Sequence, residues 1–523
     1  MFRKTAFMAD EISDFNLDPS TPIEVTGGQI TGALSEDGSV AIYKGIPFAA
    51  PPVGDLRWKA PQPVEGWNGV KECTEFGPVE YQPFKDVSDM ELLQSQPWMQ
   101  PYTKDFLVNE EEHVADEDCL YLNVWAPAGE TKQKKPVIVY VHGGGFDEGS
   151  GAIKVYTGEE IARNEGLVYV SINYRFGIFG FLTTPELDAE SENGTSGNYG
   201  LMDVAASLQW VHDNIAKFGG DPDNVTLVGQ SAGGIAVECM VASPLAKGLI
   251  NRAVILSGDA IGSAHRTASK ETVQAAFSEA YPEATLMDLR ASSSAEVWNS
   301  YRLKGDVVID GYVLTAQMED TMKAGKQNPV DLLLSFVEGD FFTFFIPVDI
   351  STIDSYEAYV KENYGDKAAD ILAVYPVESD EDAYAMYKQV CIDAEIMTLY
   401  VYAKLNEKTG RTAYIDYFTH TLPGPFDCGA FHTADVPYWN GALDGRAEWL
   451  EDIDYDISKV MQKYLADFAA SGNPNGEGLT EWAAYNGETP LSYLHIGDNE
   501  FEMIEMPSDR FGFWMGYYAD VLA

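Results

Sequence analysis

The sequence has few basic residues. Among its 523 residues, Lys and Arg together number 34 and Asp and Glu number 82, so the formal net charge is −48. A surface this acidic repels the phosphates of nucleic acids and the headgroups of anionic lipids. We therefore expect neither a nucleic acid nor a membrane surface as a partner. Solubility is the simplest role of the charge, and attraction of cationic substrates is the alternative.

Long apolar runs are also missing. No run approaches the roughly 20 residues that a membrane-spanning helix needs. The first 20 residues carry two basic residues but no apolar stretch of the kind found in a signal peptide. Cysteine is scarce as well, and the odd number of five fits a reducing compartment without required disulfides. We therefore expect a cytoplasmic protein, or a secreted one if a signal segment has been removed.

The sequence does contain short apolar runs that alternate with helical patterns. The runs show little polar alternation, which is typical of strands buried on both faces of a sheet; they cover residues 136–141, 167–172, 225–229, 253–258, 330–336 and 413–418. Helical spacing of apolar residues occurs at 200–220, 232–243 and 456–472. This alternation predicts an α/β fold with a mostly parallel, doubly wound central sheet flanked by helices.

No internal repeat or long linker divides the chain. We therefore expect a single domain over residues 1–523, with residues 1–23 as an N-terminal extension. Two helix-rich insertions, at roughly 259–306 and 345–408, are expected to form a cap over one edge of the sheet.

The segment "VTLVGQSAGGI", residues 225–235, places Ser231 between a predicted strand and a predicted helix. A Gly-x-Ser-x-Gly sequence in this context is typical of a nucleophile elbow, whereas the same letters elsewhere mark only a tight turn. The first N–H groups of the following helix favour a developing oxyanion. The context therefore favours Ser231 as a nucleophile.

An oxyanion hole requires backbone N–H groups beside the nucleophile. The segment "HGGGF", residues 142–146, follows a buried strand and offers consecutive N–H groups without side chains. In α/β-hydrolases such a loop precedes the elbow and supplies these donors. We expect Gly144 and Gly145, together with Ala232 directly after the serine, to form the oxyanion hole.

The general base should be a histidine that follows the nucleophile and the acid in the chain. Of seven histidines only His420, His432 and His495 lie late enough. His420 ends the strand at 413–418, where a packing or capping role is more common. His432 lies in the loop "GAFHTADVPYW" and is the best placed of the three.

The acid should follow the strand at 330–336. The segment "VDLLLSFVEGDFF" supplies two carboxylates there, Glu338 and Asp340. The local pattern does not choose between them. Whichever residue acts would fix the tautomer of the histidine and stabilise its charged form.

Many ordered segments resemble the type-B carboxylesterase/cholinesterase family of α/β-hydrolases, from about Val25 to the C-terminus. They read "YKGIPFAAPPVGDLRW", "EDCLYLNVW", "VIVYVHGGGF", "SINYRFGIFGFL", "GNYGLMDVAASLQWVHDNIAKFGGDPDNVTLVGQSAGG", "GAFHTADVPY" and "DFAASGNPN". The resemblance implies a serine carboxylesterase with a small-molecule ester as its substrate and no metal or organic cofactor. It leaves the oligomeric state open.

The resemblance also implies roles for single residues. The family nucleophile falls on Ser231 and its histidine on His432, while a family Glu-Gly pair falls on Glu338 and Gly339. This selects Glu338 over Asp340 as the acid, although the match is looser here than at the serine. Two further positions, Ser257 and Asp435, are similar to residues that support the triad in the family. An internal ion pair of the family falls on Arg57 and Glu117.

The chain departs from the family pattern at two places. Relatives mostly carry glutamate where this chain has Gln230, directly before the serine. Gln230 keeps the shape and removes the charge, so we expect a neutral ester, with a short acyl or an aryl group, rather than a cationic one. Glu80 stands where the family often has a cysteine that pairs with the position of Cys119, which leaves Cys73 as a possible partner for a disulfide.

The sequence does not identify the ester. Four aromatic residues near the motifs could line a pocket or belong to the core: Trp98, Phe146, Phe342 and Trp439. A lipase-like esterase that acts on neutral lipids and a non-catalytic binding module of the same fold are the alternatives.

Overall fold

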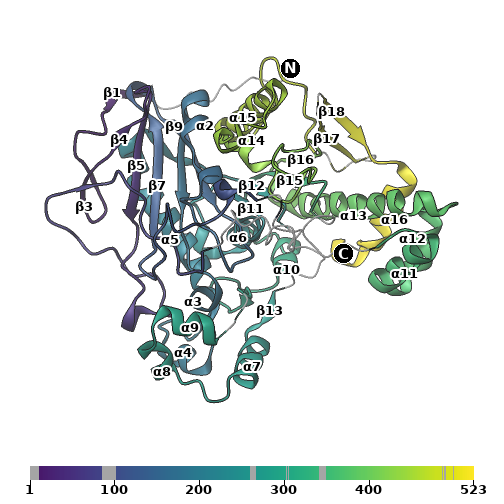
Figure 1. Cartoon of the computed structure of the whole chain (residues 1–523), viewed down its shortest axis with the longest axis horizontal. Coiled ribbons are helices and arrows are strands. Elements are labelled where there is room, and N and C mark those ends of the chain that lie inside the picture. Colours follow the sequence, from purple (N-terminus) through teal and green to yellow (C-terminus); the bar gives the residue numbers. More distant parts are fainter. Residues whose placement is uncertain are drawn as a thin grey trace.

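The centre of the computed structural model is a sheet of eleven strands (Figure 1). The structure describes residues 11–84, 100, 102–258, 267–301, 303, 305–340, 349–485, 487, 491–498 and 500–523. In spatial order the strands are β18 (Phe501–Glu505), β17 (Ser492–Ile496), β16 (Ala413–Phe418), β15 (Asp331–Val337), β12 (Arg252–Leu256), β11 (Gly220–Gln230), β9 (Lys135–Val141), β10 (Val168–Ile172), β7 (Tyr121–Pro127), β5 (Val40–Pro47) and β4 (Ala33–Leu34).

The middle of this sheet is parallel. Every pairing from β10 across to β17 is parallel, whereas β7, β5 and β4 at one end and β18 at the other pair antiparallel with their neighbours. All six strands predicted from apolar runs lie in the parallel part. The predicted mostly parallel sheet is therefore confirmed.

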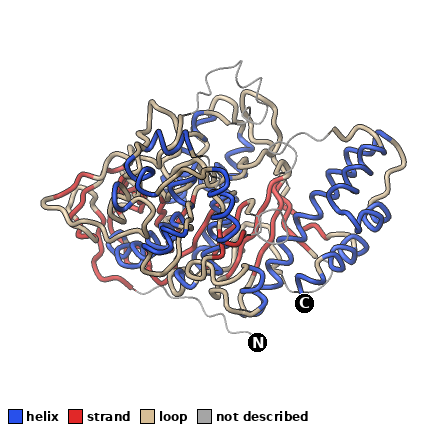
Figure 2. The backbone as a smooth tube through the Cα atoms, turned by 90° about the horizontal axis from the view of Figure 1, so that it is seen from below, coloured by secondary structure: helices blue, strands red, loops and turns tan. Residues whose placement is uncertain are grey.

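Helices cover both faces of the sheet (Figure 1). One face carries α2 (Glu159–Glu165), α14 (Val436–Asn440) and α15 (Asp452–Ser471). The other carries α5 (Tyr199–Asn214), α6 (Ala232–Ala242) and α13 (Ala383–Asn406). In the perpendicular view the strands run between helices (Figure 2). The sheet is thus doubly wound, as the alternation of strands and helices predicts.

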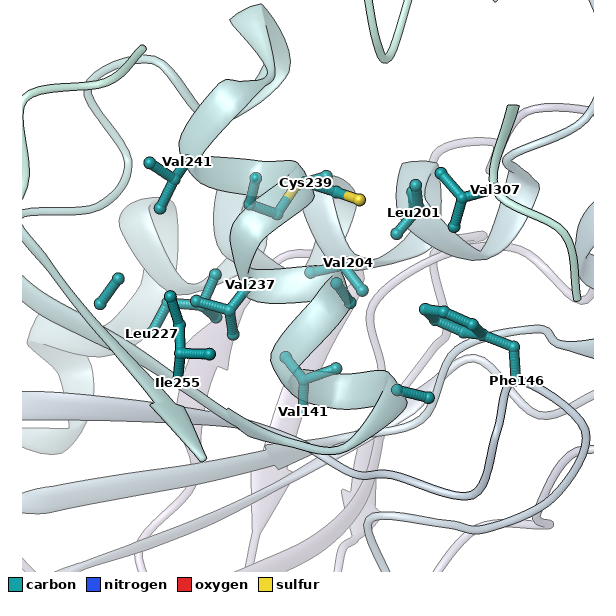
Figure 3. Packing of buried hydrophobic residues seen from close by; sticks show 14 of the residues in the cluster. Val141, Phe146, Leu201, Val204, Leu227, Val237, Cys239, Val241, Ile255 and Val307 are labelled. Atoms are coloured by element: carbon teal, nitrogen blue, oxygen red, sulfur yellow. The ribbon is translucent and has the colours of Figure 1, made fainter. Parts of the chain in front are cut away.

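Two apolar cores result, because successive side chains of a strand point to opposite faces. In β9, Val139 belongs to the core under α5 and α6, and Tyr140 belongs to the core under α14 and α15. Figure 3 shows the first core, where Val237 of α6 packs near Leu227 of β11 and Ile255 of β12. This packing holds α6 against β11 and β12.

The remaining elements surround the sheet. The other helices are α3 (Gly177–Phe181), α4 (Pro185–Glu190), α7 (Lys270–Ala280), α8 (Leu286–Ala291), α9 (Ser294–Ser300), α10 (Met318–Lys323), α11 (Ile353–Tyr364), α12 (Ala368–Val374), α16 (Ser508–Tyr517) and α17 (Ala519–Leu522). Small sheets pair β1 (Glu11–Leu17) with β8 (Gly129–Gln133), β3 (Gly28–Thr31) with β2 (Ile23–Val25) and β6 (Val70–Glu72), and β13 (Ala268–Ser269) with β14 (Val308–Ile309). Within the described residues, no helix is both long and apolar enough to cross a membrane.

The described parts of the two predicted insertions are rich in helices. The first contains α7, α8 and α9, and the second contains α11, α12 and α13. Of these, α13 packs on β15 and β16, so it covers a face of the sheet rather than its edge. The division into one domain with two cap insertions stays a prediction.

Candidate active site

Ser231 lies in a strained turn between β11 and α6. Its backbone angles are φ 57° and ψ −125°, a conformation that non-glycine residues rarely adopt and that costs about 1–3 kcal/mol. Glycines make the turn possible. A Cβ atom on Gly229 would lie 2.2 Å from the carbonyl oxygen of Gly233, and one on Gly233 would lie 2.1 Å from that of Val141. The predicted strand–turn–helix arrangement is confirmed, and packing around the serine explains the glycines.

The glycine loop after β9 lies against this turn. A Cβ atom on Gly143 would be 3.0 Å from the Cβ atom of Ser231 and 2.8 Å from the carbonyl oxygen of Gln230. The next two residues, Gly144 and Gly145, have φ angles of 109° and 64°, which favour glycine. Ala232 begins α6, where the first N–H groups have no partner within the helix. The loop and the helix start therefore both adjoin the serine.

His432 lies close to the same turn and is held by a carboxylate. Its Nδ1 atom is 2.6 Å from Oδ1 of Asp340, and Oδ2 of Asp340 accepts the N–H of Val337 at 3.1 Å. The Nε2 atom of His432 is 3.2 Å from Nε2 of Gln230, the residue before the serine. The Tyr102 hydroxyl donates to the His432 carbonyl at 3.1 Å. His432, Asp340 and the elbow thus form one cluster.

The preference for Glu338 as the acid is wrong, since the carboxylate that contacts His432 belongs to Asp340. The register of the backbone explains the difference. Gly339 forms a parallel bridge with Phe431, and its N–H donates to the carbonyl of Ala430 at 2.7 Å. The next residues along the two segments, Asp340 and His432, are therefore neighbours.

Glu338 is directed elsewhere. Its Oε1 atom is 2.7 Å from Nζ of Lys388 on α13, and its side chain is 32% exposed. Gly339 is essential to the register, because a Cβ atom there would lie 2.3 Å from the carbonyl oxygen of Ala430. The family alignment placed the acid two residues early because it matched the Glu-Gly letters rather than this backbone bridge.

His142 and His420 lie in environments that differ from that of His432. His142 is buried, and burial lowers its pKa to about 4, so the ring stays neutral. His420 lies between Asp454 and Asp498, at 2.9 Å and 2.7 Å. Burial alone would lower the pKa of His420, but the hydrogen bonds to both carboxylates outweigh burial and raise it. His420 is thus buried and hydrogen-bonded to two carboxylates, whereas Asp340 is held by His432.

Asp435 and Ser257 lie in the buried surroundings of the site. Burial, followed by the negative charge of Asp340, raises the pKa of Asp435 to about 7. Its Oδ2 atom accepts the indole N–H of Trp439 at 3.2 Å. Ser257 has a φ angle of 49°, and its N–H donates to the carbonyl of Ser335 at 2.8 Å. Supporting roles for Asp435 and Ser257 stay predictions.

The expected ion pair and the possible disulfide have different outcomes. The ion pair is present, with Nε and Nη2 of Arg57 at 2.7 Å and 2.5 Å from the carboxylate of Glu117. All five cysteines are free, so Cys73 and Cys119 form no disulfide. Instead the Cys119 thiol donates to Glu80 at 2.7 Å. Within the described part of the chain, no group of histidine, cysteine or acidic residues could hold a metal.

The aromatic residues suggested as pocket walls are only partly described. Phe146 is 5% exposed and packs against Phe181 with ring centroids 5.0 Å apart, and Trp439 is 1% exposed. Both therefore belong to the core. Trp98 and Phe342 lie outside the described residues.

The structure also gives positions at the site to residues for which the sequence predicts no role there. Gly143 lies against Ser231, Gly339 sets the register of Asp340, and the Tyr102 hydroxyl donates to the backbone carbonyl of His432. Gly143 stands within the glycine loop and could have been found there. Tyr102 lies about 330 residues before its partner, and no local pattern indicates it.

The fold and the cluster define an α/β-hydrolase, and comparisons with known proteins agree. The sequence profile of the Carboxylesterase family matches residues 19–514. A para-nitrobenzyl esterase of Bacillus subtilis (strain 168) is 33% identical over 486 residues, which cover 88% of this chain and 92% of that protein. A fumonisin B1 esterase of Sphingopyxis macrogoltabida is 32% identical over 511 residues, 92% and 88% of the two chains.

A solved structure supports the same assignment. A PNB esterase structure superposes with a TM-score of 0.76 at 28% sequence identity and covers 95% of this chain and 99% of that one. The chain belongs to the carboxylesterase family. It is a carboxylic ester hydrolase that acts on small-molecule esters.

Proposed function

We propose that Ser231, His432 and Asp340 hydrolyse neutral carboxylic esters through an acyl-enzyme intermediate. The observation that carries the proposal is the contact of 2.6 Å between Nδ1 of His432 and Asp340, beside the strained turn that holds Ser231. A carboxylate only accepts hydrogen bonds, so Nδ1 carries the proton and Nε2 keeps a lone pair. Nε2 is therefore the atom that can take a proton from the serine.

The first half of the reaction follows from this arrangement. His432 takes the proton of Ser231 through Nε2 as the serine oxygen attacks the ester carbonyl. The charge that develops on the carbonyl oxygen is stabilised by the N–H groups of Gly144, Gly145 and Ala232. His432 then gives its proton to the departing alcohol, and the acyl group stays on the serine.

In the second half, water replaces the alcohol. His432 accepts a proton from the water, which attacks the acyl-enzyme and releases the carboxylic acid. Asp340 keeps the imidazole oriented and stabilises its charged form in both halves. None of these steps requires a metal or an organic cofactor.

The uncharged amide of Gln230 supports a neutral substrate. Gln230 is 1% exposed and lies directly before the serine, at the place where a carboxylate would attract a cationic ester. The similar fumonisin B1 esterase and para-nitrobenzyl esterase are named for particular esters. We extend to this chain only the chemistry that their names share, namely ester hydrolysis, and propose short acyl or aryl esters as substrates.

Replacement of the serine tests the proposal. Ser231→Ala should lower turnover of p-nitrophenyl butyrate by about 10⁶-fold and abolish labelling by an organophosphonate, with an unchanged thermal midpoint. Ser471→Ala, which changes an exposed serine at the end of α15, is the control and should keep both activities. Full activity of Ser231→Ala would refute the proposal.

A panel of substrates tests the proposed preference for neutral esters. The kcat/KM values should be compared for p-nitrophenyl esters of increasing acyl length, a p-nitrobenzyl ester, an aryl ester, a choline ester and fumonisin B1. We expect the neutral esters to exceed the choline ester. Preference for the choline ester would contradict the proposed neutral substrate class.

A further inference from the structure

Gln230 contacts His432 at Nε2, the atom through which His432 would act as a base. Its Nε2 atom lies 3.2 Å from Nε2 of His432. The nucleophile does not occupy this position, since within the described part of the chain the hydroxyl of Ser231 makes no hydrogen bond. The resting base therefore faces an amide rather than the serine.

The direction of this hydrogen bond follows from the other side of the ring. Because Asp340 accepts the proton of Nδ1, the neutral ring has an acceptor at Nε2. The amide nitrogen of Gln230 has two protons to donate. The amide oxygen of Gln230 points toward Gly143. A Cβ atom on Gly143 would lie 2.8 Å from this oxygen. The amide thus donates to His432 and places its oxygen beside the glycine loop.

We propose that Gln230 is a positioning residue that holds His432 in its neutral form, with Nε2 ready to accept a proton, until an ester binds. The inference rests on the proposed function, since it assigns a role relative to His432 as the base. A charged imidazole would carry a proton at Nε2 and face the amide protons, which costs the hydrogen bond. A glutamate at this position would have the opposite effect, because a carboxylate favours a proton on Nε2.

The other groups around His432 must be taken into account. Asp340 faces Nδ1 from the end of β15, Asp435 acts on the ring from the start of α14, and the Tyr102 hydroxyl binds the backbone. Asp340 is the same in all the variants below. Asp435 titrates near pH 7 and could add its own change, so it must be removed in a control.

The predicted consequence concerns the acid limb of kcat/KM as a function of pH. Gln230→Glu should move the midpoint of this limb upward by about one to three pH units, because it adds a negative charge beside Nε2. Gln230→Met keeps the shape and loses the donor, so it should move the midpoint upward by about half a unit. The order of the three midpoints is therefore wild type, Gln230→Met and Gln230→Glu.

Two controls make the experiment specific. Gln327→Met changes another buried glutamine, which bonds to the carbonyl of Leu405, and should leave the midpoint unchanged. In an Asp435→Asn background the two shifts at position 230 should persist. If they vanish there, Asp435 and not Gln230 sets the limb, and the inference is wrong.

The outcomes separate this inference from the proposed function. If Gln230 accepts rather than donates, Gln230→Met moves the midpoint downward, and unchanged midpoints in both variants would mean that Gln230 has no such role. In both cases Ser231→Ala would still be inactive toward p-nitrophenyl butyrate. If Ser231→Ala is active, the proposed function fails, whatever the pH profiles show.

Discussion

Ser231 follows β11 and Asp340 follows β15, and both lie near His432. The two strand ends differ in the contacts that position these side chains. At the end of β11, a Cβ atom on Gly229 would lie 2.2 Å from the carbonyl oxygen of Gly233, and one on Gly233 would lie 2.1 Å from that of Val141, so the turn requires glycines within two residues of Ser231 in the chain. At the end of β15, the position of Asp340 depends on a bridge to Phe431, 92 residues later than Gly339. The glycines that permit the turn are sequence neighbours of Ser231, whereas the position of Asp340 depends on the pairing of distant segments.

This difference explains what could be predicted from the sequence. Apolar runs and glycine spacing act within a few residues, so the parallel strands, the elbow and the glycine loop could all be found. The acid could only be narrowed to Glu338 and Asp340, because the choice depends on the register between β15 and residues 430–432. The strands β7 and β17 also escaped prediction, since "YLNVWAP" and "SYLHI" mix polar and apolar residues.

The largest expected effect separates the two carboxylates at the end of β15. Asp340→Asn should lower kcat by about 10⁴-fold, because an amide no longer enforces the proton on Nδ1 of His432. Glu338→Gln is the matched control and should change kcat by less than about threefold, as Glu338 binds Lys388 instead. Steady-state kinetics with p-nitrophenyl butyrate measure both. A larger loss in Glu338→Gln would restore Glu338 as the acid.

The next largest effect on kcat is expected from a methyl group at Gly339, in the bridge between Gly339 and Phe431. Gly339→Ala should lower kcat by about 100-fold, because the new Cβ atom would lie 2.3 Å from the carbonyl oxygen of Ala430 and push Asp340 away from His432. Gly512→Ala in α16 has no atom within 4 Å of its new Cβ and is the control. Kinetics and circular dichroism of both variants give the answer. Wild-type kcat in a folded Gly339→Ala variant would show that the bridge does not position the acid.

A smaller effect concerns stability and pH. The pKa of Asp435 is about 7 in the folded protein and about 4 in an unfolded chain. Between these values only the folded state keeps the proton, so the free energy of unfolding falls as the pH rises. Between pH 5 and 8, the wild type should lose about 3 kcal/mol relative to Asp435→Asn, which cannot titrate.

Urea unfolding of both proteins at pH 5 and pH 8 measures this difference. Glu477→Gln, which changes an exposed carboxylate in the loop after α15, is a control for the general effect of removing one negative charge. An equal pH dependence of the wild type and Asp435→Asn would show that Asp435 is ionised throughout this range.

The smallest effect is expected at the partner of Glu338. Lys388→Met removes a partly exposed ion pair and should lower the free energy of unfolding by less than about 1 kcal/mol, with little change in kcat. The same kinetic and urea assays apply. A loss of kcat comparable to that of Asp340→Asn would show that the Glu338–Lys388 ion pair is also needed for activity.

The outermost strands of the central sheet bear on self-association. At one border, β4 consists of only two residues, Ala33 and Leu34. At the other, β18 exposes Glu502 and Glu505, and the whole chain carries a net charge of −48. A strand added to either border would find too few backbone partners or a row of like charges. Both borders therefore disfavour the addition of a strand from another molecule.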